Sequence, residues 1–181
     1  MKRRNRNLIA LTLLALLALQ ILTSLAGCSG SEKSKNLPTF EGIPTAVVEA
    51  ASDYVKGEFE KSQKNLAADD GYKLLDWKLD KVTYCTKYDD FEGMTLDIYS
   101  LKYTYKADNI DKVPLVGDAH ATENGWYCPG EGDSTYLIFE GEKYICALFC
   151  PDGDPANAAE NNIFRDDLQG ALAASDVSAS N

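Results

Sequence analysis

The middle of this 181-residue chain carries three stretches that are typical of β-strands, because they are rich in β-branched and aromatic residues. They are residues 72–88 (YKLLDWKLDKVTYCTKY), 94–107 (MTLDIYSLKYTYKA) and 134–150 (STYLIFEGEKYICALFC). Asp89, Asp90 and Gly93 provide a hairpin loop between the first two, and Gly141 divides the third within Glu140-Gly141-Glu142. We therefore expect a single antiparallel sheet, with a further short strand over residues 113–116.

Helices are predicted on both sides of this region. Over residues 44–66, apolar side chains recur at steps of three and four, with charged side chains on the other faces, at Val47, Ala51, Val55 and Phe59. Pro44 suits the first turn of such a helix. After the sheet, Asp154 as N-cap and Pro155 as the first helical residue predict a short C-terminal helix.

Together these elements predict an α+β fold. The long N-terminal amphipathic helix should pack on a curved antiparallel sheet, and the short helix should follow. The order of elements resembles that of cystatin-like and NTF2-like folds, in which a curved sheet wraps around a helix. This resemblance implies a fold and not a function, since function has to be argued from a site.

Residues 1–27 have the layout of a secretory signal. Basic residues between Lys2 and Arg6 precede an apolar run from Leu8 to Gly27. A membrane-spanning helix is the alternative, because about 20 apolar residues suffice to cross a bilayer. The motif Leu25-Ala26-Gly27-Cys28 resembles the lipobox of bacterial lipoproteins. The resemblance implies that Cys28 is lipidated, that residues 1–27 are removed, and that the protein is anchored on the extracytoplasmic face of the cell membrane.

The remaining chain divides into a linker, a domain and a tail. Residues 28–39 hold the lipidated cysteine and a small, polar stretch that we interpret as a flexible tether. A single domain is expected over residues 40–174, and residues 175–181 are expected to form a disordered tail.

The charge of the chain limits its partners. It holds 28 acidic and 18 basic side chains, for a formal charge of −10. Four of the basic side chains lie in the signal, which holds no acid, so the rest carries 14 basic and 28 acidic side chains, or −14. Nucleic acid is not an expected partner, because phosphate neutralisation needs clustered Lys and Arg. We expect membrane contact through the lipid anchor, and an envelope ligand or an exported protein as partner.

Four cysteines follow the lipobox: Cys85, Cys128, Cys146 and Cys150. Outside the cytoplasm an even number of thiols favours disulfides. Cys146 and Cys150 would lie about 13 Å apart along a straight strand, too far to bridge each other. We therefore favour a bridge from Cys128 to Cys146 or Cys150, and buried free thiols are the alternative.

His120 is the one histidine of the chain. It is a candidate general base, with Asp118 or Glu123 to orient it and a cysteine or serine as nucleophile. A loop histidine without a chemical role is the alternative. The spacings of His120 and the cysteines do not match the usual zinc patterns, so neither a metal site nor another cofactor is expected.

The predicted strands are rich in tyrosine. These side chains either line a groove for sugars or peptides, or fill the core of the sheet as cross-strand neighbours. Trp126 and Tyr127 follow the turn signal Asn124-Gly125, where aromatic side chains have a weaker packing reason. We therefore predict Trp126 and Tyr127 as ligand-contact residues.

The sequence favours a non-enzymatic, lipid-anchored binding or scaffolding domain at the bacterial cell envelope. Two alternatives remain. One is an envelope hydrolase or transferase that uses His120 with nearby acids, and the other is a structural or inhibitory partner of another exported protein.

Overall fold

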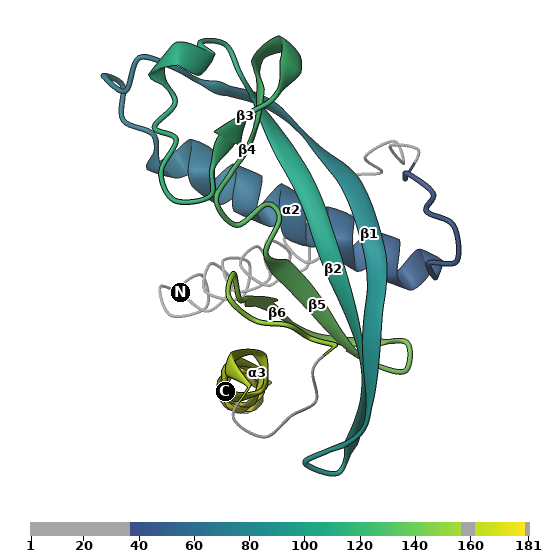
Figure 1. Cartoon of the computed structure of the whole chain (residues 1–181). Helices are drawn as coiled ribbons and strands as arrows, with labels where there is room; N and C mark the ends of the chain where they lie inside the picture. The colour runs from purple at the N-terminus through teal and green to yellow at the C-terminus, as the bar shows by residue number, and fades with distance from the viewer. Residues whose placement is uncertain (1–36, 157–161, 180–181) are drawn as a thin grey trace, which may run out of the picture. The chain divides into compact units, whose positions relative to one another are not determined.

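The computed structural model describes residues 37–156 and 162–179. The predicted signal, Cys28 and most of the predicted tether lie outside the described residues. The elements are α2 (Thr45–Asn65), β1 (Leu74–Phe91), β2 (Met94–Ala107), β3 (His120–Ala121), β4 (Trp126–Cys128), β5 (Thr135–Glu140), β6 (Lys143–Phe149) and α3 (Ile163–Ala179), as Figure 1 shows. Short 3₁₀ turns occupy Ile110–Lys112 and Glu123–Gly125. The predicted α+β class is confirmed. Neither described α-helix is long and apolar enough to span a bilayer.

The strands form one six-stranded antiparallel sheet in which β2 is central. β1 pairs along the full length of β2 on one side, and Figure 1 shows the two strands as a long curved hairpin. The other side of β2 is shared, since β4 pairs with residues 105–106 and β5 with residues 97–101. The β1–β2 ladder contains four register shifts, which bend and twist a strand pair.

Each face of the sheet packs against one helix. Side chains of a strand alternate between its two faces. On one face, Tyr99, Leu101, Tyr103, Leu137 and Phe139 pack in one core with Val47, Ala51, Val55 and Phe59 of α2. On the opposite face, Leu96, Ile98 and Ile138 pack in a second core with Phe164, Leu168 and Leu172 of α3. The predicted long helix therefore packs on the sheet as expected, and its observed ends lie within one residue of the predicted ones.

Two local predictions were wrong. The C-terminal helix does not begin at Asp154 and Pro155. The carboxylate of Asp154 accepts a hydrogen bond from the Ala156 N–H at 2.9 Å, which closes a turn, and α3 begins at Ile163. The cap is Asn162, whose Oδ1 accepts the Phe164 N–H at 3.0 Å. α3 also continues past residue 174, where we placed the end of the domain.

The segment 113–116 is not a strand. The Val113 N–H donates to the carbonyl oxygen of Ile110 at 3.1 Å, which ends a 3₁₀ turn. The chain then runs as an irregular loop to β3. This loop provides one wall of the site described next.

Candidate functional site

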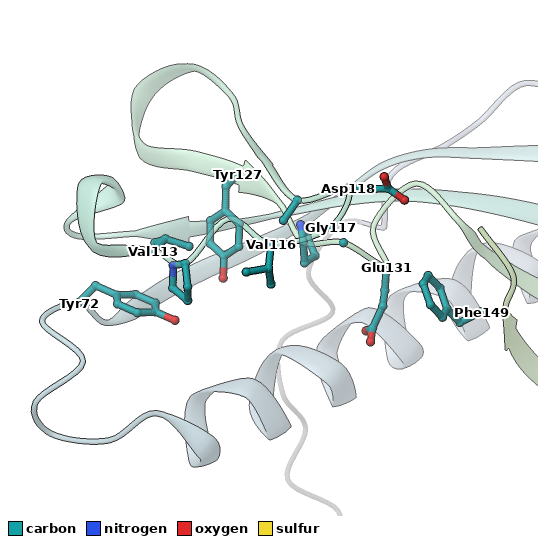
Figure 2. A pocket seen from close by; sticks show the side chains of 12 residues that line it. Tyr72, Val113, Val116, Gly117, Asp118, Tyr127, Glu131 and Phe149 are labelled. Atoms are coloured by element: carbon teal, nitrogen blue, oxygen red, sulfur yellow. The ribbon is translucent and has the colours of Figure 1, made fainter. Parts of the chain in front are cut away.

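An open hollow of about 460 Å³ lies between the loop that follows β2 and the end of β6. Its walls come from Tyr72 before β1, from Val113, Pro114 and residues 116–119, from Tyr127 and residues 129–131, and from Phe149 at the end of β6. Figure 2 shows that the side chains of Tyr127 and Glu131 project toward the side of the hollow that faces α2. The hollow therefore lies on the α2 side of the sheet.

The walls combine exposed apolar side chains with a few polar groups. Val116 is 73 % exposed and Phe149 is 47 % exposed, so both walls present apolar surface to solvent. Tyr72, Asp118 and Glu131 supply the polar groups. Burial raises the pKa of Tyr127 and, less strongly, that of Tyr72, so both hydroxyls keep their proton at neutral pH and can donate a hydrogen bond.

Of the two predicted contact residues, only Tyr127 lines the hollow. Trp126 precedes it in β4 and therefore points to the opposite face of the sheet. There the ammonium groups of Lys78 and Lys106 lie 4.8 and 5.9 Å from the centre of the Trp126 ring. Trp126 thus contacts two cations rather than the hollow.

Most strand tyrosines fill the core, as the packing alternative predicted. Tyr84, Tyr99, Phe139 and Tyr144 form a row of edge-to-face contacts across β1, β2, β5 and β6. A second group joins α2 to the sheet and contains Tyr54, Phe59, Tyr103, Tyr105 and Tyr127. These rings pack against one another and do not form an aromatic groove, although Tyr127, at the end of the second group, also lines the hollow.

Val116 and Phe149, the most exposed apolar residues of the hollow, were not predicted as contact residues from the sequence. Phe149 ends a strand-like stretch and Val116 lies in what we predicted as a strand. The sequence did contain a signal for a loop here. Pro114 and Gly117 lie within or next to the apolar run, and proline and glycine interrupt regular structure.

The short hairpin of β3 and β4 places His120 directly opposite Cys128. Its turn uses Asn124 (φ 59°) and Gly125 (φ 78°), the dipeptide with the strongest preference for this conformation. The His120 Nδ1 lies 3.0 Å from the main-chain carbonyl oxygen of Asp118. Because a carbonyl oxygen only accepts hydrogen bonds, Nδ1 is the ring nitrogen that carries the proton in this contact, so in the neutral ring the lone pair is on Nε2. The ring is thus oriented by a carbonyl oxygen and not by the expected carboxylate.

Asp133 completes a group with His120 and Cys128. One donor atom from each of the three side chains lies within 4.8 Å of the other two. Asp133 reaches this position through the loop between β4 and β5, where the Gly132 carbonyl accepts the Tyr103 N–H at 3.0 Å. The Lys102 ammonium lies 3.1 Å from Oδ1 of Asp133.

The ionisation of Cys128 argues against nucleophilic catalysis. Its side chain is only 1 % exposed. Burial, followed by the charge and hydrogen bonding of Asp133, raises the pKa of the Cys128 thiol to about 12. A nucleophilic cysteine needs the thiolate, which a pKa this high disfavours at neutral pH. The group therefore has the residue types of a cysteine–histidine enzyme without the required charge state.

Cys85, Cys128, Cys146 and Cys150 are all free thiols in the structure, which corresponds to the alternative of free thiols rather than to the favoured bridge from Cys128. The strand register explains this for Cys85 and Cys146. Thr86, next to Cys85, pairs with Ile98, Ile98 with Ile138, and Ile138 with Cys146. Three strand spacings amount to about 14 Å, whereas disulfide-bonded cysteines have Cα atoms less than about 7 Å apart.

Comparison of the chain with known protein families, with curated proteins and with solved structures finds no match. Function has therefore to be inferred from the hollow and from the residues around it.

Proposed function

We propose that the chain is a lipid-anchored, extracytoplasmic domain that binds a peptide-like ligand at the bacterial cell envelope without converting it chemically. The observation that carries the proposal is the hollow in which Val116 and Phe149 expose their side chains. Exposed apolar surface beside a concave site, with few polar groups, is typical of ligand binding. The anchor is inferred from the lipobox at Cys28.

The chemistry of the walls favours a peptide segment. Val116 and Phe149 suit an apolar side chain, while the carboxylate of Glu131, which projects toward the α2 side of the hollow in Figure 2, suits an amine or an amide N–H. The hydroxyls of Tyr72 and Tyr127 add hydrogen-bonding groups that carry no charge. An unsubstituted glycan lacks the apolar side chain for which these walls provide space.

Binding is favoured over the hydrolase alternative by the state of the side chains near His120. The Cys128 thiol is buried and, with its raised pKa, protonated at neutral pH. His120 is oriented by the Asp118 carbonyl oxygen. A structural or inhibitory partner of an exported protein would use the same hollow for a protein segment rather than for a free peptide.

The proposal is tested with the full chain, purified in detergent and mixed with short envelope peptides, muropeptides, glycans or candidate exported proteins. A ligand at 100 times its dissociation constant should raise the free energy of unfolding by about 2.7 kcal/mol, which thermal unfolding detects. Peptides should produce this increase and glycans without a peptide should not.

Val116→Asp should abolish the increase, because it places a charge in the apolar wall. Leu75→Asp is the matched control, since Leu75 is also exposed and apolar but lies outside the hollow. The proposal fails if no peptide stabilises the chain, or if Val116→Asp leaves the increase unchanged.

A further inference from the structure

We propose that His120, Cys128 and Asp133 form a binding site for a divalent metal ion of the zinc type, separate from the hollow. Their donor atoms lie within 4.8 Å of one another although the residues come from two strands and a loop. The spacing along the chain did not predict this group, because zinc patterns with close pairs of ligands describe a different local structure.

The three donor atoms select the class of metal. A thiol sulfur, an imidazole nitrogen and a carboxylate oxygen are the ligands that Zn²⁺ takes in proteins. Ca²⁺ and Mg²⁺ are bound by oxygen atoms, so His120 and Cys128 disfavour them. Three protein ligands leave the fourth tetrahedral position of Zn²⁺ for water or for a ligand.

The distances between the three donor atoms are close to those found around a bound Zn²⁺ ion. With metal–ligand distances of about 2.0–2.3 Å, tetrahedral donor atoms lie about 3.3–3.8 Å from one another. The side chains therefore have to close by roughly 1 Å. His120 and Asp133 are exposed, on a two-residue strand and on a loop, so both have room for this movement, while Cys128 is buried and held in place.

The hydrogen bond of His120 prepares its ring for a metal. Histidine ligands usually donate their second ring N–H to a carboxylate or a backbone carbonyl, which fixes the tautomer and the orientation of the ring. The Asp118 carbonyl oxygen accepts such a bond from Nδ1 at 3.0 Å. Nε2 is thereby left as the nitrogen with a lone pair for the ion.

Lys102 is the cation that a metal would have to replace beside Asp133. Its ammonium lies 3.1 Å from Oδ1 and 3.3 Å from Oδ2 of the carboxylate. Metal binding exchanges this ion pair for a metal–oxygen bond and replaces the thiol proton of Cys128 by a metal–sulfur bond, with the proton released to the buffer. Asp80 also lies close enough to interact with the ammonium, so Lys102 retains an acidic neighbour.

The site is separate from the hollow because Cys128 and Tyr127, neighbours in β4, point to opposite faces of the sheet. Only Tyr127 lines the hollow. A negative result in the metal-binding experiment therefore does not contradict the proposed peptide binding. A negative result in the peptide-binding experiment does not contradict the proposed metal site either.

Co²⁺ is the probe, because a bond from Co²⁺ to a thiolate gives a near-ultraviolet charge-transfer band and a tetrahedral site gives strong visible bands. We expect the reduced, metal-free full chain to bind one Co²⁺ with both signals, and Zn²⁺ to displace it. Cys128→Ser should remove the charge-transfer band. His120→Ala and Asp133→Asn should weaken Zn²⁺ binding at least about 100-fold, since even changes around the ligands cost 10–100-fold.

Two variants separate a metal site from general effects on folding. Cys85→Ser removes another free thiol and should leave the Co²⁺ spectrum unchanged. Lys102→Met should tighten Zn²⁺ binding several-fold, because it removes the competing cation. The proposal is overturned if Co²⁺ gives no charge-transfer band, if the band survives Cys128→Ser, or if Lys102→Met weakens Zn²⁺ binding.

Discussion

At the scale of single residues, Gly132 holds the loop between β4 and β5 against Cys128. A Cβ atom at this position would lie 2.6 Å from the Cys128 sulfur and 2.8 Å from the carbonyl oxygen of Tyr103. No side chain fits this space without movement of the loop. The absence of a Cβ therefore allows Asp133 to approach Cys128.

We expect Gly132→Ala to lower the free energy of unfolding by about 1–3 kcal/mol, the usual cost of overpacking a buried position. Urea unfolding of the full chain measures the change. Gly57→Ala is the control, because Gly57 lies in α2 with nothing within 4 Å of its Cβ position. That change should instead raise the free energy of unfolding by about 1 kcal/mol through helix propensity. Equal effects of the two substitutions would contradict this account of Gly132.

The hairpin of β3 and β4 could have been predicted from the sequence, because Asn124-Gly125 is a strong hairpin signal. Its register could not, since the two-residue loop that Asn-Gly favours would place Ala121 opposite Cys128. The three-residue connection Glu123–Gly125 of the structure places His120 there instead. The position of Asp133 could not have been predicted, because it depends on the bond between Gly132 and Tyr103 across a loop.

At the scale of elements, the sequence predicted secondary structure best where a hydrophobic periodicity or a strand-like composition extends over many residues. The periodicity of α2 located both of its ends, and the strand-like stretches located β1, β2, β5 and β6. The start of α3 was missed, because Asp154-Pro155 satisfies the rules for a helix start as well as those for a turn. The hollow was missed because Val116 and Phe149 lie far apart in the sequence and meet only through the fold.

The aromatic contacts between α2 and the sheet make stability depend on alkaline pH. Burial raises the pKa of Tyr54 to about 12, and it raises the pKa values of Tyr103 and Tyr105 still further. An unfolded tyrosine titrates near 10. Above this pH the unfolded tyrosines lose protons that the folded chain retains, so their contribution to the free energy of unfolding should fall as the pH rises beyond 10. Burial also raises the pKa values of the Cys128, Cys146 and Cys150 thiols, so these groups add to the fall from about pH 9 upward.

Urea unfolding at about pH 8 and about pH 11 measures this loss. Tyr54→Phe should reduce the difference between the two values, because it removes one of the groups responsible. Tyr84→Phe should reduce it less, since Tyr84 is largely exposed. Tyrosinate absorbance gives an independent measurement, and titration of all ten tyrosines near pH 10 in the folded chain would contradict the prediction.

At the scale of the whole molecule, Cys28 should decide where the domain is found. We expect the full chain to incorporate labelled fatty acid and to fractionate with membranes, and we expect Cys28→Ala to abolish the labelling and the cleavage that follows it. A Cys85→Ser chain is the control for loss of a thiol elsewhere. Fatty-acid labelling that survives Cys28→Ala would refute the lipobox assignment, and membrane retention without label or cleavage would show that residues 8–27 span the bilayer.

The long strand β1 has a consequence for proteins crowded on a surface. Among the described residues it pairs with β2 alone, so one side of its 18 residues is an open sheet edge that a second copy could extend. Its four register shifts bend this edge, and charged side chains of both signs lie along β1, where Lys78 pairs with Asp80 at 2.8 Å and Lys87 with Asp89 at 3.3 Å. Bends and charged side chains are features that disfavour the pairing of one sheet edge with another. If the proposed anchor confines these molecules to a surface, we expect this edge to keep neighbouring sheets from joining.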